Sequence, residues 1–179
     1  MKRLILFFFL ITNVSVAQSY LTEYGNVNFL SKASLNEFYG ESDKLNGLID
    51  LSQNLLDFYV DLNTLDTGIG LRNKHMRDNY LETEDYPFAE FSGKMSSIPS
   101  LDPGTKEPVT AIGSFKIHGV EREIEVKGTL MKNSNGDLEL QAGFNILLSD
   151  YDIEIPKLVF YELAEKQEVT INATLKPKK

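Results

Sequence analysis

The sequence predicts an all-β protein, a closed antiparallel barrel of about eight strands with one or two short helices near its mouth. Several segments alternate apolar and polar residues with the period of two that is typical of half-buried strands. Short turn sequences join neighbouring segments, which favours antiparallel pairing. Because little of the chain has helical periodicity, a sheet with one apolar face closes on itself more economically than it packs against a second layer.

The chain begins with the features of a secretory signal. A basic start precedes the apolar run 4–11, and small residues at Ser15 and Ala17 form a cleavage site of the A-x-A type. This run is too short to cross a bilayer as a helix, which needs about 20 apolar residues. We expect residues 1–17 to be a signal peptide and residues 18–179 to form one domain, located in the periplasm or secreted.

The strands are expected in order along the mature chain. The clearest alternation places Leu56, Phe58, Val60 and Leu62 on one face of a strand and more polar residues on the other. The same pattern returns further along and is weaker near the start. The expected strands are 26–33, 38–42, 45–51, 56–63, 88–96, 109–117, 123–130, 138–148 and 169–175.

The connections also carry local signals. The pair Asn135-Gly136 supplies the positive φ angles that a tight hairpin turn demands, and His118-Gly119 is a second candidate turn. A short helix is expected over 156–164, because a proline at its first position suits the first turn.

A polar, turn-rich stretch interrupts the strand pattern in the middle of the chain. Within it, Met76, Tyr80 and Leu81 recur at helical spacing over 73–83, and Asn73 is placed to be the N-cap. We expect a short helix across one barrel mouth, with these apolar side chains plugging the core. Two interpretations remain open: the helix only closes the barrel end, or it forms a lid or a headgroup site.

The inward-facing residues do not decide whether the barrel interior is packed or contains a cavity. Small residues at Ala111, Gly113, Gly128, Ala142 and Ala173 favour a cavity. Alternatively, the glycines let strongly coiled strands bend and the alanines fill a tapered core. A barrel of about eight strands is compatible with both, because its interior can be packed or can hold one small ligand.

Composition narrows the function classes. Loss of Lys2 and Arg3 with the signal leaves 16 basic residues against 26 acidic ones, a net charge of −10. Because such a surface repels phosphate groups, we expect neither nucleic-acid binding nor stable membrane insertion of the mature chain. The chain has no cysteine, so disulfides, thiolate catalysis and sulfur-based zinc sites are excluded.

The sequence gives only weak signals for a metal-binding or catalytic site. His75, Asp78 and His118 could in principle bind zinc, but nothing in the sequence fixes the geometry of a third ligand. The acidic cluster at 150–154 lacks the glycine and spacing of an EF-hand loop. No G-x-S-x-G nucleophile motif is present. We therefore expect a protein that is not an enzyme.

Several motifs follow one another in a characteristic order: Thr-Gly after a strand, a polar helical segment with R-N-x-H, a strand with P-F-x-x-F, and an I-H-G-V hairpin. The residues that carry them are Thr67, Gly68, Arg72, Asn73, His75, Met76, Tyr80, Leu81, Pro87, Phe91, Gly113, Ile117, His118, Gly119 and Val120. With these motifs the chain resembles the YceI-like family of secreted polyisoprenoid-binding proteins over nearly its whole mature length. The resemblance implies a lipocalin-like barrel whose elongated pore holds a long isoprenoid or a similar amphiphile.

Two sets of candidate binding residues follow. The apolar set is expected to line the ligand site: Phe29, Leu56, Phe58, Val60, Leu62, Phe91, Ala111, Gly113, Phe115, Ile124, Val126, Gly128, Ala142, Phe144 and Ile146. The polar set at the mouth is expected to contact the ligand's head: Arg72, Asn73, His75, Arg77 and Tyr80. No cofactor is expected beyond a bound lipid or isoprenoid, and homodimerisation is left open.

Two functions of different class remain. The favoured one is non-catalytic binding, storage or transport of a hydrophobic ligand: a polyisoprenoid, an isoprenoid quinone or a fatty-acid-like lipid. The alternative is an envelope stress or interaction protein with a filled core that binds a protein partner through its surface. The two differ in whether the barrel interior is hollow.

The signal peptide gives the first testable prediction. N-terminal sequencing of the exported protein should begin at Gln18, because cleavage is expected after Ala17. An envelope fraction in which the protein still begins with Met1 would contradict it.

Overall fold

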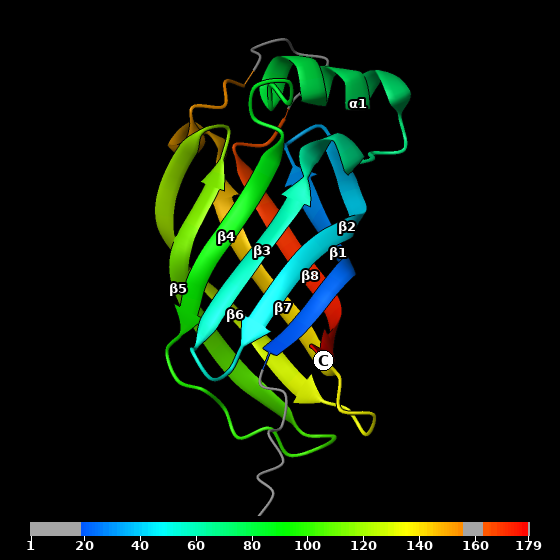
Figure 1. Cartoon of the computed structure of the whole chain (residues 1–179). Helices are drawn as coiled ribbons and strands as arrows, with labels where there is room; N and C mark the ends of the chain where they lie inside the picture. Colours follow the sequence, from blue (N-terminus) through cyan, green and yellow to red (C-terminus); the bar gives the residue numbers. More distant parts are fainter. Residues whose placement is uncertain (1–18, 156–162, 179) are drawn as a thin grey trace, which may run out of the picture.

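The computed structural model describes residues 19–155 and 163–178, which form a closed barrel of eight antiparallel strands (Figure 1). Each strand pairs with the next, and β1 closes the barrel against β8. The strands are β1 (Ser19–Lys32), β2 (Glu37–Asp50), β3 (Leu55–Asp61), β4 (Phe88–Met95), β5 (Lys106–Ile117), β6 (Val120–Lys132), β7 (Leu138–Leu147) and β8 (Lys166–Pro177). The helical elements are the 3-10 turns η1 (Leu62–Thr64) and η3 (Leu148–Tyr151), the helix α1 (Gly70–His75) and the π-helical turn η2 (Met76–Tyr80).

This architecture confirms the expected fold class. The expected cleavage site after Ala17 lies outside the described residues, as does most of the helix expected over 156–164. In the described part of the chain, no helix has the length and apolar character needed to cross a membrane.

The weakly patterned start of the chain forms two long strands instead of three short ones. The segments 38–42 and 45–51 belong to a single strand, β2. Its pairing with β1 shifts register on both sides of Gly25. Buried positions in β2 are even-numbered up to Ser42 and odd-numbered from Leu45 to Ile49. The bulge therefore reverses the phase of the alternation, which made one strand look like two.

One of the two expected hairpin turns has the expected geometry, and the other does not. At the turn between β5 and β6, His118 and Gly119 both have positive φ angles, 52° and 75°, as a two-residue turn of the I′ type requires. At the other turn only Gly136 has a positive φ, 89°. The prediction for Asn135 was wrong, because the Asn133 side chain holds this turn by accepting a hydrogen bond from the Asn135 N–H at 3.0 Å.

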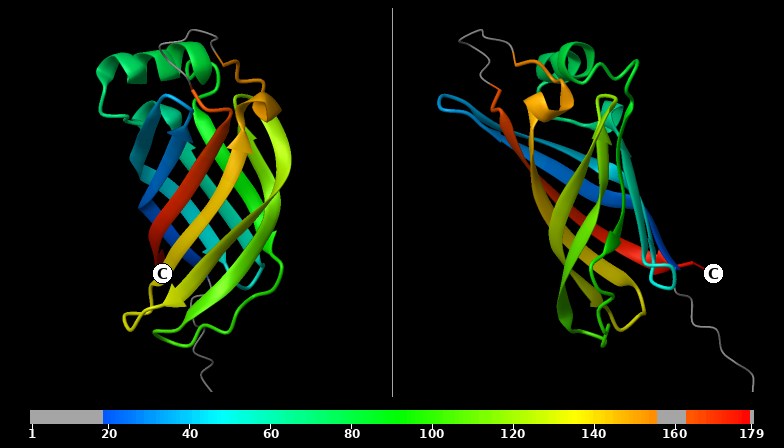
Figure 2. Two further views of the ribbon diagram at one scale, coloured as in Figure 1. Left: turned by 180° about the vertical axis from the view of Figure 1, so that it is seen from behind. Right: turned by 90° about the vertical axis from the view of Figure 1, so that its left-hand side faces the viewer.

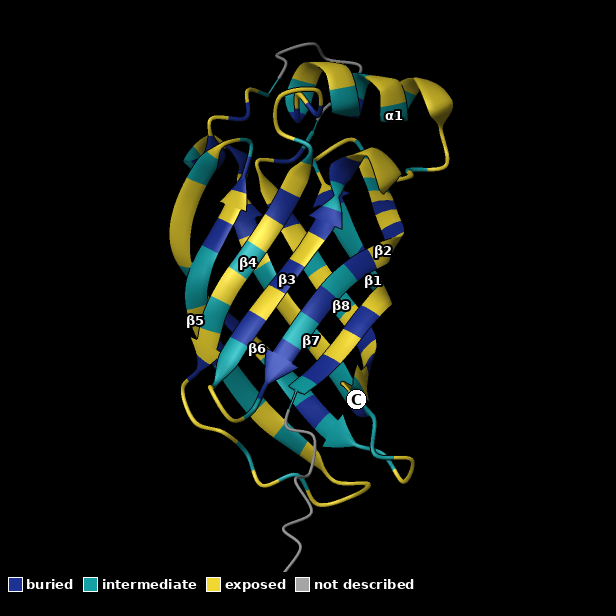
Figure 3. Cartoon of the chain, in the orientation of Figure 1, coloured by how far each residue is buried: buried dark blue, intermediate teal, exposed yellow. Residues whose placement is uncertain are grey.

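The barrel end where β1 begins and β8 ends is tightly packed. Apolar side chains from five strands lie there with 0–3% of their surface exposed, on strands along which buried and exposed residues alternate (Figure 3). They are Tyr20, Ile49, Leu130, Leu138 and Leu175. This cluster, the basal plug, closes one end of the barrel.

Helical elements cross the opposite end of the barrel (Figures 1 and 2). Met76 of η2 and Leu81 after it are 7% and 8% exposed, and Tyr80 packs partly buried against the core. The expected plugging of this end by the three side chains is thus confirmed.

The helix begins earlier than expected. α1 starts at Gly70, and Ile69 takes the N-cap position without a side-chain hydrogen bond. Asn73 Oδ1 instead accepts hydrogen bonds from the N–H and the hydroxyl of Thr67 at 2.8 and 2.6 Å. Asn73 Nδ2 donates to Asp66 at 2.7 Å. The assignment of Asn73 as N-cap was wrong, because its amide holds the turn that precedes the helix.

A buried carboxylate organises the turn between β2 and β3. Asp50 accepts hydrogen bonds from the hydroxyls of Ser52 and Ser19, at 2.5 and 2.8 Å, and from the Gln53 N–H at 3.0 Å. These hydrogen bonds, that of the Ser52 hydroxyl first, lower the pKa of Asp50 from 3.8 to about 2. The ionised form therefore stabilises the folded state.

Asp50→Asn is expected to lower the free energy of unfolding at neutral pH, because the neutral amide accepts these hydrogen bonds more weakly. Since the folded pKa is depressed, the stabilisation is present above pH 4 and is lost as the pH falls towards about 2. The difference from wild type in urea unfolding should shrink over that window. Asp102→Asn, at an exposed position, is the control and should show no such change. A pH-independent difference for Asp50→Asn would contradict the assignment.

Candidate functional site

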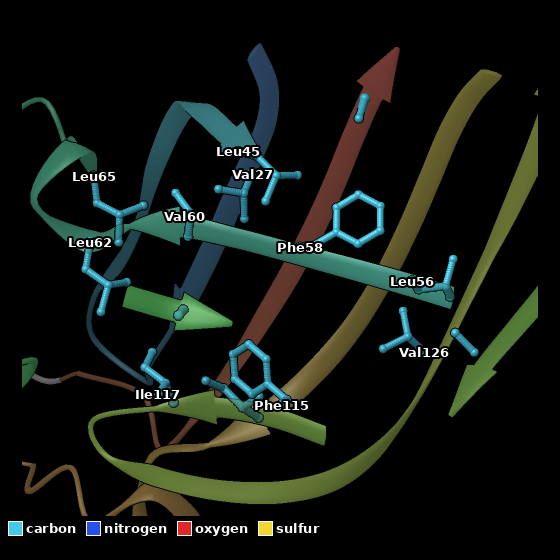
Figure 4. Packing of buried hydrophobic residues seen from close by; sticks show 14 of the residues in the cluster. Val27, Leu45, Leu56, Phe58, Val60, Leu62, Leu65, Phe115, Ile117 and Val126 are labelled. Carbon is cyan, nitrogen blue, oxygen red and sulfur yellow. The ribbon is translucent and has the colours of Figure 1, made fainter. Parts of the chain in front are cut away.

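The barrel interior is hollow. A cavity of about 330 Å³ lies between the basal plug and the helical elements at the opposite end. Its wall is almost entirely apolar and comes from all eight strands; Figure 4 shows Phe58, Val60 and Phe115 pointing into this space. The hollow interior answers the question of filling that the sequence left open.

Most of the apolar candidate residues line this cavity. Those that do are Phe29, Leu56, Phe58, Val60, Leu62, Phe91, Ala111, Phe115, Val126, Gly128, Ala142, Phe144 and Ile146. Leu62 does so from η1 and not from a strand, because β3 ends at Asp61. Contact of these residues with a ligand stays a prediction.

Gly113 and Ile124 are not among the residues that line the cavity, so the structure does not support a ligand contact for them. A Cβ atom at Gly113 would lie 2.3 Å from the Ser92 carbonyl oxygen, so this glycine permits the close approach of β4 to β5. Ile124 pairs with Gly113 across β5 and β6 and packs partly buried against the core. At Gly113 the small residue therefore serves the geometry of the strands and does not enlarge the cavity.

Sequence reasoning missed several lining residues. Val27, Val169 and Ile171 alternate with polar neighbours in β1 and β8, so the pattern that found the other strands could have found them. Gln167 is polar, and Leu163 lies outside any strand. No periodicity signals either residue.

At the end that the helical elements cover, the cavity is lined from α1 and from the hairpin formed by β1 and β2, and we call this part its mouth. Arg72, His75 and Tyr80 of the polar candidate set line the cavity here. The Arg72 guanidinium lies over the Phe38 ring, 4.4 Å from its centroid, which ties the helix to β2. This contact leaves a cationic group at the edge of an apolar chamber.

Asn73 and Arg77 do not line the cavity, so a direct headgroup contact from either is not supported. The hydrogen bond from Asn73 lowers the pKa of Asp66, and the nearby Arg77 charge adds to the effect. Lys74 pairs with Asp78 on the exposed side of the helix and lowers the pKa of that carboxyl. These groups fix the helix above the mouth.

A histidine fastens the segment that follows η2. His118 Nδ1 lies 3.0 Å from the Tyr151 carbonyl oxygen and Nε2 lies 3.1 Å from the Glu82 carboxylate. Both partners only accept hydrogen bonds, so a ring nitrogen that carries a proton donates it to the acceptor that it faces. The Tyr86 ring packs edge-on against the imidazole, with centroids 4.9 Å apart. His118 thus joins the β5–β6 turn, η3 and the covering segment.

The described residues contain no group of three or more His, Asp or Glu side chains placed to hold a metal ion. His118 bonds to Tyr151 and Glu82, and Asp78 pairs with Lys74, so the two side chains serve different parts of the fold. What the site offers chemically is an apolar chamber with polar groups at its mouth.

Comparisons with known proteins agree with this geometry. The family model described as YceI-like domain matches residues 19–176. No curated protein matches the chain. A solved polyisoprenoid binding domain from Saccharophagus degradans, implicated in plant cell wall breakdown, is 22% identical with a TM-score of 0.78, covering 91% of this chain and 99% of that one.

Two other solved structures are similar. BcnA from Burkholderia cenocepacia is 14% identical with a TM-score of 0.66, covering 84% of this chain and 95% of that one. The YCEI protein from Campylobacter jejuni is 16% identical with a TM-score of 0.64, covering 83% and 90%. At these identities the likeness is one of fold.

His118→Asn is expected to lower the free energy of unfolding by about 1–3 kcal/mol, because the shorter side chain loses a partly buried hydrogen bond to the Tyr151 carbonyl and its contact with the Glu82 carboxylate. Asparagine tolerates the positive φ angle at this position. The loss of stability would therefore come from the missing imidazole contacts and not from backbone strain. Urea unfolding measures the total, and hydrogen exchange should rise in residues 82–86. Glu82→Gln, which removes only the charge of the exposed partner, should cost less. Equal stability of His118→Asn and wild type would refute the role.

Proposed function

The chain belongs to the YceI-like domain family, and on that premise we propose that it is a non-catalytic protein that binds, stores or transports a hydrophobic ligand inside its barrel. The ligand class is a polyisoprenoid, an isoprenoid quinone or a fatty-acid-like lipid. The observation that carries the proposal is the apolar cavity above the basal plug.

The size and lining of the cavity support a lipid tail as the bound group. Small-molecule sites in proteins are typically concave, mostly apolar and about 300–1,000 Å³ in volume, and this cavity of about 330 Å³ falls in that range. Burying a methylene group contributes about 0.8 kcal/mol, so ten buried carbons contribute about 8 kcal/mol. This exceeds the lower estimates of the cost of association, about 4 kcal/mol. Affinity should therefore come from the tail.

The polar groups at the mouth favour a ligand with a polar head over a pure hydrocarbon. Arg72 lines the cavity from α1 and supplies donors for charge-assisted hydrogen bonds to an anionic head, and His75 lines the cavity from the same helix. The mature net charge of −10 belongs to the chain as a whole, so the Arg72 guanidinium is a local exception near the mouth.

The proposal extends to location. The basic start, the apolar run 4–11 and the small residues before Gln18 support export to the periplasm or the exterior. The alternative function, a partner-binding protein with a filled core, has weaker support, because the core contains a cavity.

Filling the cavity tests the proposal. Organic extraction of the purified protein and mass spectrometry should release about one lipid per chain from wild type. Ala142→Phe should abolish this lipid while the protein stays folded, because Ala142 lines the cavity and a phenyl ring there occupies the tail's space. Unchanged lipid content in this variant would place the ligand elsewhere and defeat the proposal.

Asn145→Phe is the matched control for that experiment, since it adds the same ring on the exposed face of the same strand and should retain the lipid. Gly128→Leu would also place a large side chain in the barrel, but it is unsuited to such a test. A Cβ atom at Gly128 would lie 2.4 Å from the Gln141 carbonyl oxygen, so a leucine would strain the strands before it filled the cavity.

Arg72→Ala is expected to weaken binding of ligands with an anionic head by about tenfold or more, and to change binding of neutral ligands much less. Binding of a fatty acid and of its methyl ester, measured by titration calorimetry at two salt concentrations, checks this. Arg77→Ala is the control, because Arg77 does not line the cavity. Equal weakening for both ligands by Arg72→Ala would show that the arginine acts only through packing on Phe38.

A further inference from the structure

One buried polar side chain lines the apolar cavity. Gln167, at the start of β8, is 4% exposed and lies between Ser31 of β1 and Ile146 of β7. The other polar or charged lining residues of the described chain are all partly or fully exposed. Gln167 is therefore distinct from the solvated groups at the mouth.

The orientation of the Gln167 amide is fixed by its partners. Nε2 donates to the Ala164 carbonyl oxygen and lies 3.3 Å from the Ser31 hydroxyl, which itself accepts the Ala164 N–H at 3.0 Å. The reverse orientation would set the amide oxygen against the Ala164 carbonyl oxygen, and neither can donate. The nitrogen must therefore face Ala164, and Oε1 faces away from it.

Oε1 of Gln167 is then left without a partner. It is buried and accepts no hydrogen bond from the described residues. Folded proteins pair nearly all such atoms, and an unpaired buried acceptor destabilises the fold unless something else supplies the donor. The cavity that Gln167 lines is where such a donor can arrive.

We propose that Gln167 Oε1 accepts a hydrogen bond from the polar end of the cavity ligand, so that the protein selects amphiphiles whose head carries an O–H or N–H donor, such as long-chain or isoprenoid alcohols. This inference rests on the proposed function, because it assumes a ligand in the cavity. β8 begins at the barrel end that α1 covers, so a head held at Gln167 leaves the tail to run towards the basal plug.

Gln167 and Arg72 favour ligand heads of different chemistry. The Arg72 guanidinium supplies donors, which suit acceptor groups such as carboxylates and phosphates. Gln167 Oε1 supplies an acceptor, which suits a donor and repels an ionised oxygen. A hydroxyl head deep in the mouth satisfies Gln167, whereas a fully ionised head is held further out.

A matched pair of ligands tests the inference. Farnesol and its methyl ether share one tail, and only farnesol has a donor. Titration calorimetry on wild type should show farnesol binding about five- to hundredfold more tightly. Without a hydrogen bond the order reverses, because the ether is the more apolar molecule and loses less hydration.

Gln167→Met keeps the length of the side chain and removes the acceptor, so the ratio of the two dissociation constants should fall to about one or below. Ile171→Val, on the same face of β8, is the control and should change both affinities together. Gln167→Met also loses the bond to Ala164. If it does not fold, the ratio in wild type alone decides.

The outcomes separate the two proposals. Farnesol and the ether binding wild type with equal affinity would overturn the role of Gln167 and leave the lipid-binding function standing. A preference for farnesol that Gln167→Met retains would also overturn it. Failure of both ligands, and of fatty acids, to bind would overturn the proposed function together with the inference.

Discussion

The barrel depends on the pairing of β1 with β8, which joins the two ends of the described chain. Without that ladder the sheet has two open edges, and its apolar face has nothing to enclose. With it, eight strands enclose a space too wide for their own side chains to fill in the middle. The hydrogen bonds from Ala164 and Gln167 to Ser31 reinforce the same seam near the mouth. Closure therefore sets both the fold and the chamber.

The period of two in the sequence was sufficient for the strands that pair without bulges. In β3 and β5, the alternation identified the face that encloses the cavity. It was insufficient in β2, where a bulge reverses the phase, and at Gly113, where the inward residue serves strand approach. Periodicity tells which face a residue is on, but the distance between two backbones is a property of the assembled sheet.

The mouth was harder to foresee, because its contacts join distant segments. Asn73 bonds to the turn before its helix, which local capping rules do not anticipate. The Ser31–Ala164 contact spans 133 residues of sequence. A glutamine in a strand also looks like a solvent-facing residue. Only the folded barrel places Gln167 between β1 and β7 with an oxygen that no described residue pairs.

The basal plug has a consequence for chain length. A chamber shut by Leu138 and Leu175, both 0% exposed, is a dead-end tunnel. A ligand in such a chamber enters and leaves through the same opening, and its head leaves first. A competing ligand cannot enter from the closed end. Each added carbon of a tail should increase the binding affinity until the tail reaches the basal plug. Carbons beyond that length would stay in water and add nothing. Under the proposed function, the length of the chamber therefore limits affinity, which should rise with tail length and then level off.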